Sequence, residues 1–478
     1  MTTPDAVVVG AGPNGLMAAV VLARAGRDVL VVEAADTPGG GTRSAALTAP
    51  GVAHDVCSAI HPLALASPAF RMLADDGLLS THGLRWVHPD VPLTHPLDGG
   101  RAAVLERSVG DTADRLGADA SSYRRLYGPL VDAGLDLVDG LLSPLDVPPR
   151  HPVHLARFGW SGIRSAHGLA RSRFDSVEAR ALFAGLAAHS ILSLRSPVTA
   201  GYGLTLGLLG HLVGWPMAAG GSQAIADALV GILTAHCGRV EFARRVLSLD
   251  ELPPSDAVLL DLTPRQVVDV VCERLPDRYR RALTSYRYGP GVFKVDWLLD
   301  GPVPWADPHS SGAGTVHLGG TLEEITAAEA DVMAGRHPQR PYVLIAQHTP
   351  FDASRVPDNR SLHTLWGYCH VPNGSTVDMT DAIERQVERF APGFRDRVLQ
   401  RHTMSTADME HHDANYVGGD INGGAGDLRQ FVARPTLGLH PWRTPVDGVW
   451  MCSASTPPGG GVHGMGGWHA AHDVLRRT

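Results

Sequence analysis

A glycine-rich turn near the start of the chain constrains the fold more than any other feature. It is Gly10-Ala11-Gly12-Pro13-Asn14-Gly15, which follows a β-branched run at 6–9 and precedes a segment with helical spacing at 13–25. In this pattern Gly10 permits a tight exit from a strand, Gly12 lets a pyrophosphate approach the backbone, and Gly15 lets the helix pack on the sheet. Phosphates then lie at the helix N-terminus, where free N–H groups and the helix dipole favour negative charge. The pattern predicts a βαβ unit that binds a dinucleotide.

An acidic residue follows at the spacing that such a unit requires. The run at 28–33 predicts a second strand, and Glu33 stands at its end. A carboxylate there accepts hydrogen bonds from ribose hydroxyls and repels a 2′-phosphate. We therefore expect Glu33 to bind the cofactor ribose, and we do not expect NADP at this site.

The loop after Glu33 narrows the choice of dinucleotide. It reads Pro38-Gly39-Gly40-Gly41-Thr42-Arg43-Ser44. It resembles the GGRxRT-like extension of the second glutathione-reductase-like class of flavoproteins, which includes amine oxidases and phytoene desaturases. The resemblance implies FAD, with Arg43 at the pyrophosphate or the flavin edge. Gly41 stands where that motif often has arginine, so we expect one basic contact to be missing.

A second glycine-rich loop near the C-terminus completes the expected site. The run at 448–452 predicts a strand, the loop at 453–465 follows, and a helix is expected at about 466–475. The N-terminus of that helix, aimed at the flavin, would stabilise the negative charge that develops at the N1–C2=O end on reduction. The cofactor is therefore expected to be held from both ends of the chain.

Three further segments extend the resemblance over the chain. They are 55–62 (DVCSAIHP), 287–294 (RYGPGVFK) and 415–424 (NYVGGDINGG). Together with the two glycine-rich loops, they make the chain similar to the phytoene-desaturase-like family of FAD-dependent oxidoreductases. The resemblance implies the fold and FAD, whereas members of that group differ in what they oxidise.

The residues expected to contact FAD lie mainly in these segments. They are Gly10, Gly12, Pro13, Asn14, Gly15, Glu33, Ala34, Gly40, Gly41, Thr42, Arg43, Val246, Ser455, Gly461, Val462 and His463.

The order of the predicted elements indicates an α/β fold with an insertion. We predict a Rossmann-type FAD-binding domain of the second glutathione-reductase-like class, with an inserted α+β substrate domain. The FAD-binding domain is expected in three parts, 1–66, 218–285 and 413–478. The substrate domain is expected as a helical part, 67–217, and a part with a mixed or antiparallel sheet, 286–412. Helical spacing at 111–142, 174–194 and 378–390, and strand patterns at 239–242, 257–261, 288–297, 314–319, 342–347 and 363–370, support this division.

Candidates for catalysis are few, because hydride transfer to a flavin needs mainly correct placement of a C–H bond. His463 lies in the loop expected beside the flavin, His61 follows the segment that leads to it, and Tyr416 lies in a polar glycine-rich loop. Each has a structural alternative: a histidine bonded to backbone, a buried histidine with hydrogen-bond partners, and a turn stabilised by side chains. Lys294 could reach flavin N5 through a water molecule, or could simply lie on the face of a strand.

Composition excludes several other classes of protein. The net charge is −8, from 41 basic and 49 acidic residues, so a nucleic-acid partner is not expected. The five cysteines are well separated and form no CxxC pair, which disfavours a disulfide scaffold and fits a cytoplasmic protein. The histidine clusters lack the spacing of a metal site, so no metal is expected. We expect no signal peptide and no membrane span, because no apolar stretch has the roughly 20 residues that a span needs.

The favoured function is that of an FAD-dependent dehydrogenase, oxidase or desaturase that acts on a fairly apolar small molecule. One alternative is a flavin-dependent isomerase without net redox. Another is a non-catalytic, escort-type lipid-binding protein with the same fold. The sequence leaves a homodimer open and does not identify the substrate or the electron acceptor.

Overall fold

A parallel sheet that uses both ends of the chain forms the first half of the molecule. The computed structural model describes residues 3–144, 151–356 and 361–477. The strand order is β16-β10-β1-β2-β9, and every neighbouring pair is parallel. The strands are β1 (Ala6–Val9), β2 (Val29–Val32), β9 (Arg239–Glu241), β10 (Ala257–Leu260) and β16 (Val449–Met451). Their apolar runs are buried on both faces, as a parallel sheet covered by helices requires.

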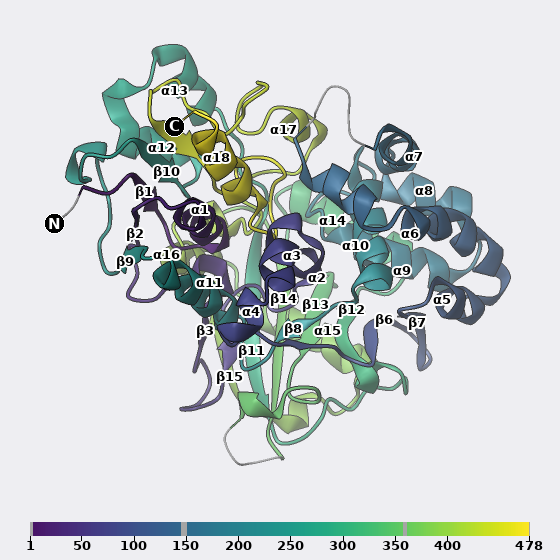
Figure 1. Ribbon diagram of the computed structural model, residues 1–478. Coiled ribbons are helices and arrows are strands. Elements are labelled where there is room, and N and C mark those ends of the chain that lie inside the picture. The colour runs from purple at the N-terminus through teal and green to yellow at the C-terminus, as the bar shows by residue number, and fades with distance from the viewer. Residues whose placement is uncertain (1–2, 145–150, 357–360, 478) are drawn as a thin grey trace.

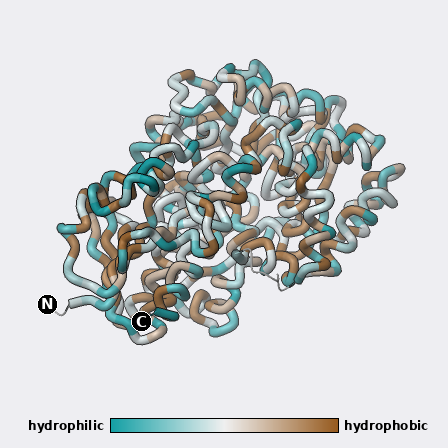
Figure 2. The backbone as a smooth tube through the Cα atoms, turned by 90° about the horizontal axis from the view of Figure 1, so that it is seen from above, coloured by the Kyte–Doolittle hydropathy of each residue, from teal (hydrophilic) through white to brown (hydrophobic). Residues whose placement is uncertain are grey.

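Helices cover both faces of this sheet. On one face α1 (Pro13–Arg24) packs between α11 (Gln223–Ala235) and α18 (Met465–Leu475). On the other face lie α12 (Pro264–Val271) and α13 (Asp277–Thr284), whose apolar side chains pack against Val7, Val9 and Leu30. Figures 1 and 2 show the two chain ends at the same side of the molecule. The first and last helices of the chain are therefore neighbours.

A seven-stranded mixed sheet forms the second half. Its order is β15-β11-β14-β13-β12-β6-β7, and only β12 and β6 are parallel. The strands are β6 (Val91–Leu97), β7 (Arg101–Leu105), β11 (Gly291–Leu299), β12 (Ala313–Leu318), β13 (Val343–Gln347), β14 (His363–Val371) and β15 (Val398–Met404). β6, β7 and β15 were not expected from the sequence. Pro92 and Pro96 in β6 hide the strand pattern, because proline disfavours a sheet interior.

The two faces of the second sheet differ in chemistry. One face is apolar and packs on α15 (Thr380–Phe390), with Val295, Val316 and Ile345 in the shared core. The strand register places ionisable and aromatic side chains on the other face. These are Lys294, Asp296, Trp366, Tyr368, His317, His95 and His402. Helices α9 (Val177–Ala188) and α14 (Leu322–Met333) lie on that side, where His189 and Glu329 contact His317 and His370.

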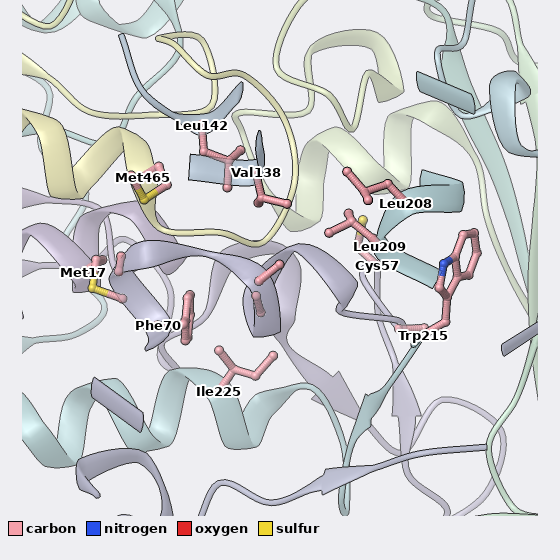
Figure 3. Packing of buried hydrophobic residues seen from close by; sticks show 14 of the residues in the cluster. Met17, Cys57, Phe70, Val138, Leu142, Leu208, Leu209, Trp215, Ile225 and Met465 are labelled. Atoms are coloured by element: carbon pink, nitrogen blue, oxygen red, sulfur yellow. The ribbon is translucent and has the colours of Figure 1, made fainter. Parts of the chain in front are cut away.

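The remaining helices join the two sheets. The longer ones are α5 (Val109–Arg115), α6 (Ala120–Leu142), α7 (Pro152–Gly162), α8 (Ala166–Arg173) and α10 (Thr199–Leu212). The short elements are α2 (Pro62–Ala66), α3 (Pro68–Asp75), α4 (Leu78–Thr81), α16 (Thr406–His412), α17 (Leu428–Val432), and the strand pairs β3 (Ser44–Ala45) with β4 (His54–Asp55) and β5 (Trp86–Val87) with β8 (Met217–Ala218). Figure 3 shows the core that these helices share with the helices of the first sheet: side chains of α3 and α6 meet those of α1, α11 and α18.

Two expected helices differ from what their periodicity suggests. The helix expected at 111–142 divides into α5 and α6, because Gly117 between them has φ +55°. The helix expected at 174–194 shortens to α9, and the chain after it passes through Ile191 at φ +50°. The expected strands and the helices at 13–25 and 378–390 are confirmed within a few residues. The five domain ranges stay a prediction.

A buried ion pair links the two halves. Arg355, which is fully buried, donates from Nη1 to Asp55 Oδ2 at 2.8 Å and from Nε to Asp352 Oδ2 at 3.1 Å. Asp55 also accepts the Ser222 N–H at 2.7 Å, and this contact fixes the start of α11. Burial alone would raise the pKa of Asp55, but Arg355 and the other donors hold it well below its usual value. The Asp55 carboxylate is therefore ionised and fully paired.

Breaking this pair should destabilise the whole protein. Arg355→Met leaves two buried carboxylates without a cation, at a cost of about 3–5 kcal/mol. For a chain of this length the melting temperature should fall by about 3–5 °C. Arg385→Met is the control, because its i,i+4 pair with Asp381 is exposed and contributes only about 0.3–0.5 kcal/mol. Equal shifts in the two variants, measured by calorimetry, would contradict the assignment.

Buried histidines should make the protein sensitive to acid. Burial lowers the pKa of His61, His95, His211 and His463 to about 4 each, whereas an unfolded histidine titrates near 6.5. Between these values the unfolded chain binds more protons, so stability falls as pH drops from 6.5 to 4. Each group contributes on the order of 3 kcal/mol. Urea unfolding across this range should show the loss. His211→Gln should flatten the curve, and the same change at exposed His440 should not.

Candidate functional site

The glycine turn at the end of β1 leaves no room for side chains. A Cβ added to Gly15 would overlap the Gly10 carbonyl oxygen, and one added to Gly12 would lie 2.7 Å from Asp261 Oδ2. Gly10 has φ +104°, which is strained for other residues. Helix α1 begins at Pro13, and its N-cap residue, Gly12, provides no capping side chain. The turn thus exposes a helix N-terminus that can hold an anion.

Glu33 lies where its carboxylate faces this turn. Its Oε2 accepts the Ala11 N–H at 2.6 Å, and its Oε1 accepts the Ala35 N–H at 2.8 Å. The Arg43 guanidinium lies 3.8 Å away. Of the other residues expected near this end of a cofactor, Ala34 is exposed and Val246 is buried in the core below the sheet.

The loop at 39–43 packs directly over the turn. The Gly39 N–H donates to Ala11 O at 2.8 Å, and Thr42 Oγ1 donates to Gly39 O at 2.8 Å. Gly40 lies so close to Gly12 that an added Cβ would be 3.3 Å from the Gly12 Cα. Arg43 Nη1 donates to His412 O at 3.1 Å, while Arg43 Nε is buried without a partner in the structure. The loop thus directs one guanidinium toward the turn.

Tyr416 explains the glycine at position 41. A Cβ on Gly41 would overlap the Tyr416 hydroxyl, so this phenol fills the space of the arginine that the motif often carries. The hydroxyl lies beside the Cys57 thiol, and loss of solvent together with Cys57 and Asp413 raises the pKa of Tyr416 well above 10. At neutral pH Tyr416 can therefore donate a proton in a hydrogen bond but does not act as a base. Its catalytic role stays a prediction.

The C-terminal loop meets the first turn through the packing of α18 on α1. A Cβ on Gly467 would overlap the Asn14 carbonyl oxygen, so the two helices touch through backbone. Ser455 Oγ donates to Gly423 O at 2.7 Å, and Ser67 Oγ donates to His463 O at 2.6 Å. Gly461 is exposed and Val462 is partly exposed, at the tip of the loop. The loop is thus anchored at both ends and open in the middle.

Both histidines expected in catalysis are neutral and hydrogen-bonded. His463 Nδ1 accepts the Met465 N–H at 3.0 Å, so Nε2 carries the proton and donates to Gly459 O at 3.1 Å. Ser222 Oγ donates to Ser58 O, so it accepts from His61 Nε2 at 2.8 Å, and the lone pair of His61 is on Nδ1, which lies 3.5 Å from Ser58 Oγ. The lone pair of His463 thus accepts a backbone N–H, whereas that of His61 faces the Ser58 hydroxyl at the longer distance of 3.5 Å. The catalytic roles of both residues stay predictions.

Two carboxylates beside the turn were missed by the sequence reasoning. Asp261 follows β10 and is only 5% exposed, and its Oδ2 accepts the Gly15 N–H at 2.9 Å. Asp413 follows α16, and its Oδ2 would lie 3.2 Å from a Cβ on Gly40. An acidic residue directly after a strand of the cofactor sheet is the signal that could have identified Asp261. Asn415, from the loop at 415–424, holds the backbone of Asp261 in place: its side-chain amide donates to Asp261 O at 3.0 Å.

The polar face of the second sheet brings a charged pair close to the same region. Lys294 is buried and donates to Asp296, whose other oxygen lies 3.5 Å from His54 Nδ1. Burial would raise the pKa of Asp296, but Lys294 and His54 lower it overall. The ammonium lies 5.9 Å from the ring centre of Trp366. Lys294 is thus an interior residue with a fixed partner, not a solvent-facing lysine.

A cavity of about 680 Å³ opens beside Arg43. Its walls come from the loop at 36–47, the start of α11, β15 and α16, and include Gln223, Met404 and His412. A volume of this size is typical of sites for small molecules and cofactors. In the described ranges no group of three or more His, Cys, Asp or Glu side chains has metal-site geometry. None of the helices in the described residues is long and apolar enough to cross a membrane.

The residues around the turn fit the FAD that the resemblance implies. The glycine turn at 10–15 leaves room for a pyrophosphate to approach the backbone, and the Glu33 carboxylate lies beside it. Within the described chain, the buried Asn14 Oδ1 and Arg43 Nε have no hydrogen-bond partner, which a ligand at the turn could supply. The helix N-terminus and Arg43 are the donors of an anion site, and beside them lies a carboxylate of the kind that accepts hydrogen bonds from a ribose.

Comparisons with known proteins agree with this geometry. Residues 8–76 match the family model of an NAD(P)-binding Rossmann-like domain. The chain is 28% identical to pyridine nucleotide-disulfide oxidoreductase domain-containing protein 2 of Rattus norvegicus, over 99% of this chain and 93% of that protein. It is also 28% identical to the phytoene dehydrogenase of Streptomyces griseus, over 82% of this chain and 77% of that protein. A putrescine oxidase structure superposes with a TM-score of 0.64 at 19% identity and covers all of both chains.

These relatives confirm two expectations. The predicted Rossmann-type α/β fold with a second, mixed sheet is confirmed, because the putrescine oxidase fold matches over the full length. The predicted resemblance to phytoene-desaturase-like and amine-oxidase-like oxidoreductases is confirmed as well. The name of the rat relative mentions a disulfide, but all five cysteines of this chain are free.

The glycine cradle gives a direct test. Gly15→Ala should abolish retention of a dinucleotide, because the added methyl group overlaps the Gly10 carbonyl and forces the turn open. Gly159→Ala in α7 is the matched control, because nothing lies within 4 Å of its Cβ position. Cofactor content after gel filtration measures the effect. Full occupancy of the Gly15→Ala variant would place the cofactor elsewhere.

Proposed function

We propose that this protein is an FAD-dependent oxidoreductase that removes a hydride from a fairly apolar small molecule. The observation that carries the proposal is the convergence at the first turn. A helix N-terminus with glycine as its N-cap residue, a carboxylate oriented by two backbone N–H groups and a guanidinium meet at a turn where Gly12 and Gly15 leave no room for a Cβ. That set suits a flavin dinucleotide with an unphosphorylated ribose.

Different residues would bind the pyrophosphate, the ribose and the flavin of FAD. The N-terminus of α1 and Arg43 would hold the pyrophosphate, and Glu33 would hold the ribose. Gly461 and Val462, in the open middle of the C-terminal loop, would lie beside the flavin. FAD supplies the hydride acceptor when bound. Tyr416 would keep its hydroxyl in the region that arginine occupies in similar proteins, and so would leave less positive charge there.

The buried polar face of the second sheet would contribute the residues that recognise the substrate. Trp366 and Tyr368 lie edge-to-face at 5.2 Å on the polar face, next to Lys294. Aromatic rings bind apolar groups, and the buried ammonium orients polar ones. This combination favours a small molecule with an apolar body and one polar group. Where a proton must also leave, we propose His61 Nδ1 as its acceptor, because its contact with Ser58 Oγ is long, at 3.5 Å.

The location and partners proposed for the protein rest on its sequence. We propose a cytoplasmic protein with a small-molecule partner and no nucleic-acid partner, on the basis of its separated cysteines and its net charge of −8. A homodimer is compatible with this function.

Anaerobic mixing with candidate substrates tests the proposal. The purified protein should be yellow, and a true substrate should bleach its flavin absorbance and yield a product lighter by two hydrogen atoms. Mass spectrometry distinguishes this from isomerisation, whose product has the mass of the substrate. A colourless protein that binds lipid would support the escort-type alternative and refute the oxidoreductase.

A further inference from the structure

Asp261 occupies an unusual position for an acidic residue. Its carboxylate lies inside the glycine turn and accepts the Gly15 N–H at 2.9 Å. Its Oδ2 is also the nearest atom to the missing Cβ of Gly12, at 2.7 Å. An acidic side chain thus lies at the helix N-terminus that is needed for phosphate, and it is almost completely removed from water.

The surroundings of Asp261 are rich in negative charge. Glu33 directly follows β2, and Asp413 directly follows α16; both act on Asp261 as like charges. The Cys452 thiol, after β16, faces it from the neighbouring strand. The cation of this region, Arg43, lies next to Glu33 and acts on Asp413. A dinucleotide would add two phosphate charges to this set.

A second observation shows that the turn is built for a ligand. Asn14, in the first turn of α1, is 6% exposed, and its Oδ1 has no partner among the described residues. A buried amide oxygen without a partner is costly, unless a donor arrives with the ligand or with water. The Asp261 carboxylate at the turn thus leaves Asn14 Oδ1 without a partner among the described residues, so the site still has a place for a ligand.

We propose that Asp261 serves in the cofactor site as a neutral carboxylic acid, so that FAD binds only the form of the protein in which Asp261 carries a proton. This inference rests on the proposed function, because it concerns how the same site accepts FAD. Oδ2 is the carbonyl oxygen that accepts from Gly15, and Oδ1 carries the proton. No bond other than the O–H bond at Oδ1 changes, and the proton comes from solvent.

The protonation state of the free protein agrees with this geometry. Burial, together with the charges of Asp413 and Glu33, raises the pKa of Asp261 to about 8, although the Gly15 N–H lowers it in part. Below that pH the acid is already neutral, and FAD affinity should not depend on pH. Above it, binding must take up one proton, so Kd should rise tenfold for each pH unit.

The experiment measures FAD dissociation from the purified flavoprotein between pH 6.5 and 9.5. The increase in FAD fluorescence on dilution reports release, and calorimetry in two buffers of different ionisation enthalpy reports proton uptake. For the wild type we expect a constant Kd up to about pH 8 and a rise of about thirtyfold by pH 9.5. About one proton should be taken up per FAD at the upper end, and none at pH 6.5.

Two variants assign the proton. Asp261→Asn keeps a carbonyl for Gly15 and is neutral at every pH, so its Kd should stay constant over the range. Asp413→Asn removes a neighbouring negative charge. Its Kd should still rise with pH, but the rise should begin at lower pH, because Asp261 then ionises more readily. The wild-type proton uptake and the Asp413→Asn shift test the proposal even where Asp261→Asn does not fold.

The outcomes separate this inference from the proposed function. FAD binding that is independent of pH in the wild type overturns the role of Asp261 and leaves the flavoprotein intact. A pH-dependent rise in Kd that persists unchanged in Asp261→Asn, or vanishes in Asp413→Asn, assigns the proton elsewhere and also overturns the role of Asp261. Failure of the wild type to bind FAD at any pH overturns both.

Discussion

The contact between the backbones at Gly10 and Gly15 is the constraint on which the rest of the structure depends. Because only hydrogen fits between them, the chain leaves β1 and enters α1 within one turn. Three further segments then approach the same turn: the loop at 39–43 and α18 at Gly467 through backbone, and Asp261 after β10 through its carboxylate. A methyl group at this point would displace all of them. The result is a junction of both chain ends that has little side-chain bulk and many N–H groups.

The second sheet complements this junction by its asymmetry. Its apolar face packs against α15, and its polar face carries Lys294, Asp296 and the rings of Trp366 and Tyr368, which join the core shared with the first half. Such buried charges are tolerated because each has a partner. The Asp55–Arg355 pair is likewise a buried charge with its partner. It lies at the boundary between the halves and connects β4 and α11 to the loop after β13. Stability and the placement of the site therefore depend on the same ionic contacts.

Local patterns predicted the first half of the molecule well. The strand, the glycine turn, the helix and Glu33 are adjacent in sequence, so their spacing alone determines the unit. β6 was missed because its two prolines break the alternation, and β15 because its pattern resembles an exposed loop. Asp261, Asp413 and Asp296 gain their meaning only from partners hundreds of residues away or across a sheet. Gly41 shows the same limit: its lost arginine was recognised, but Tyr416 as the filler of that space was not.

The most direct test of the account is a crystal structure of the yellow protein as purified. The account predicts electron density for FAD with its pyrophosphate at the N-terminus of α1, its ribose at Glu33 and its flavin beside Gly461 and Val462. Continuous density for a dinucleotide in any other part of the molecule would contradict it. So would a glycine turn that holds only the Asp261 carboxylate and water.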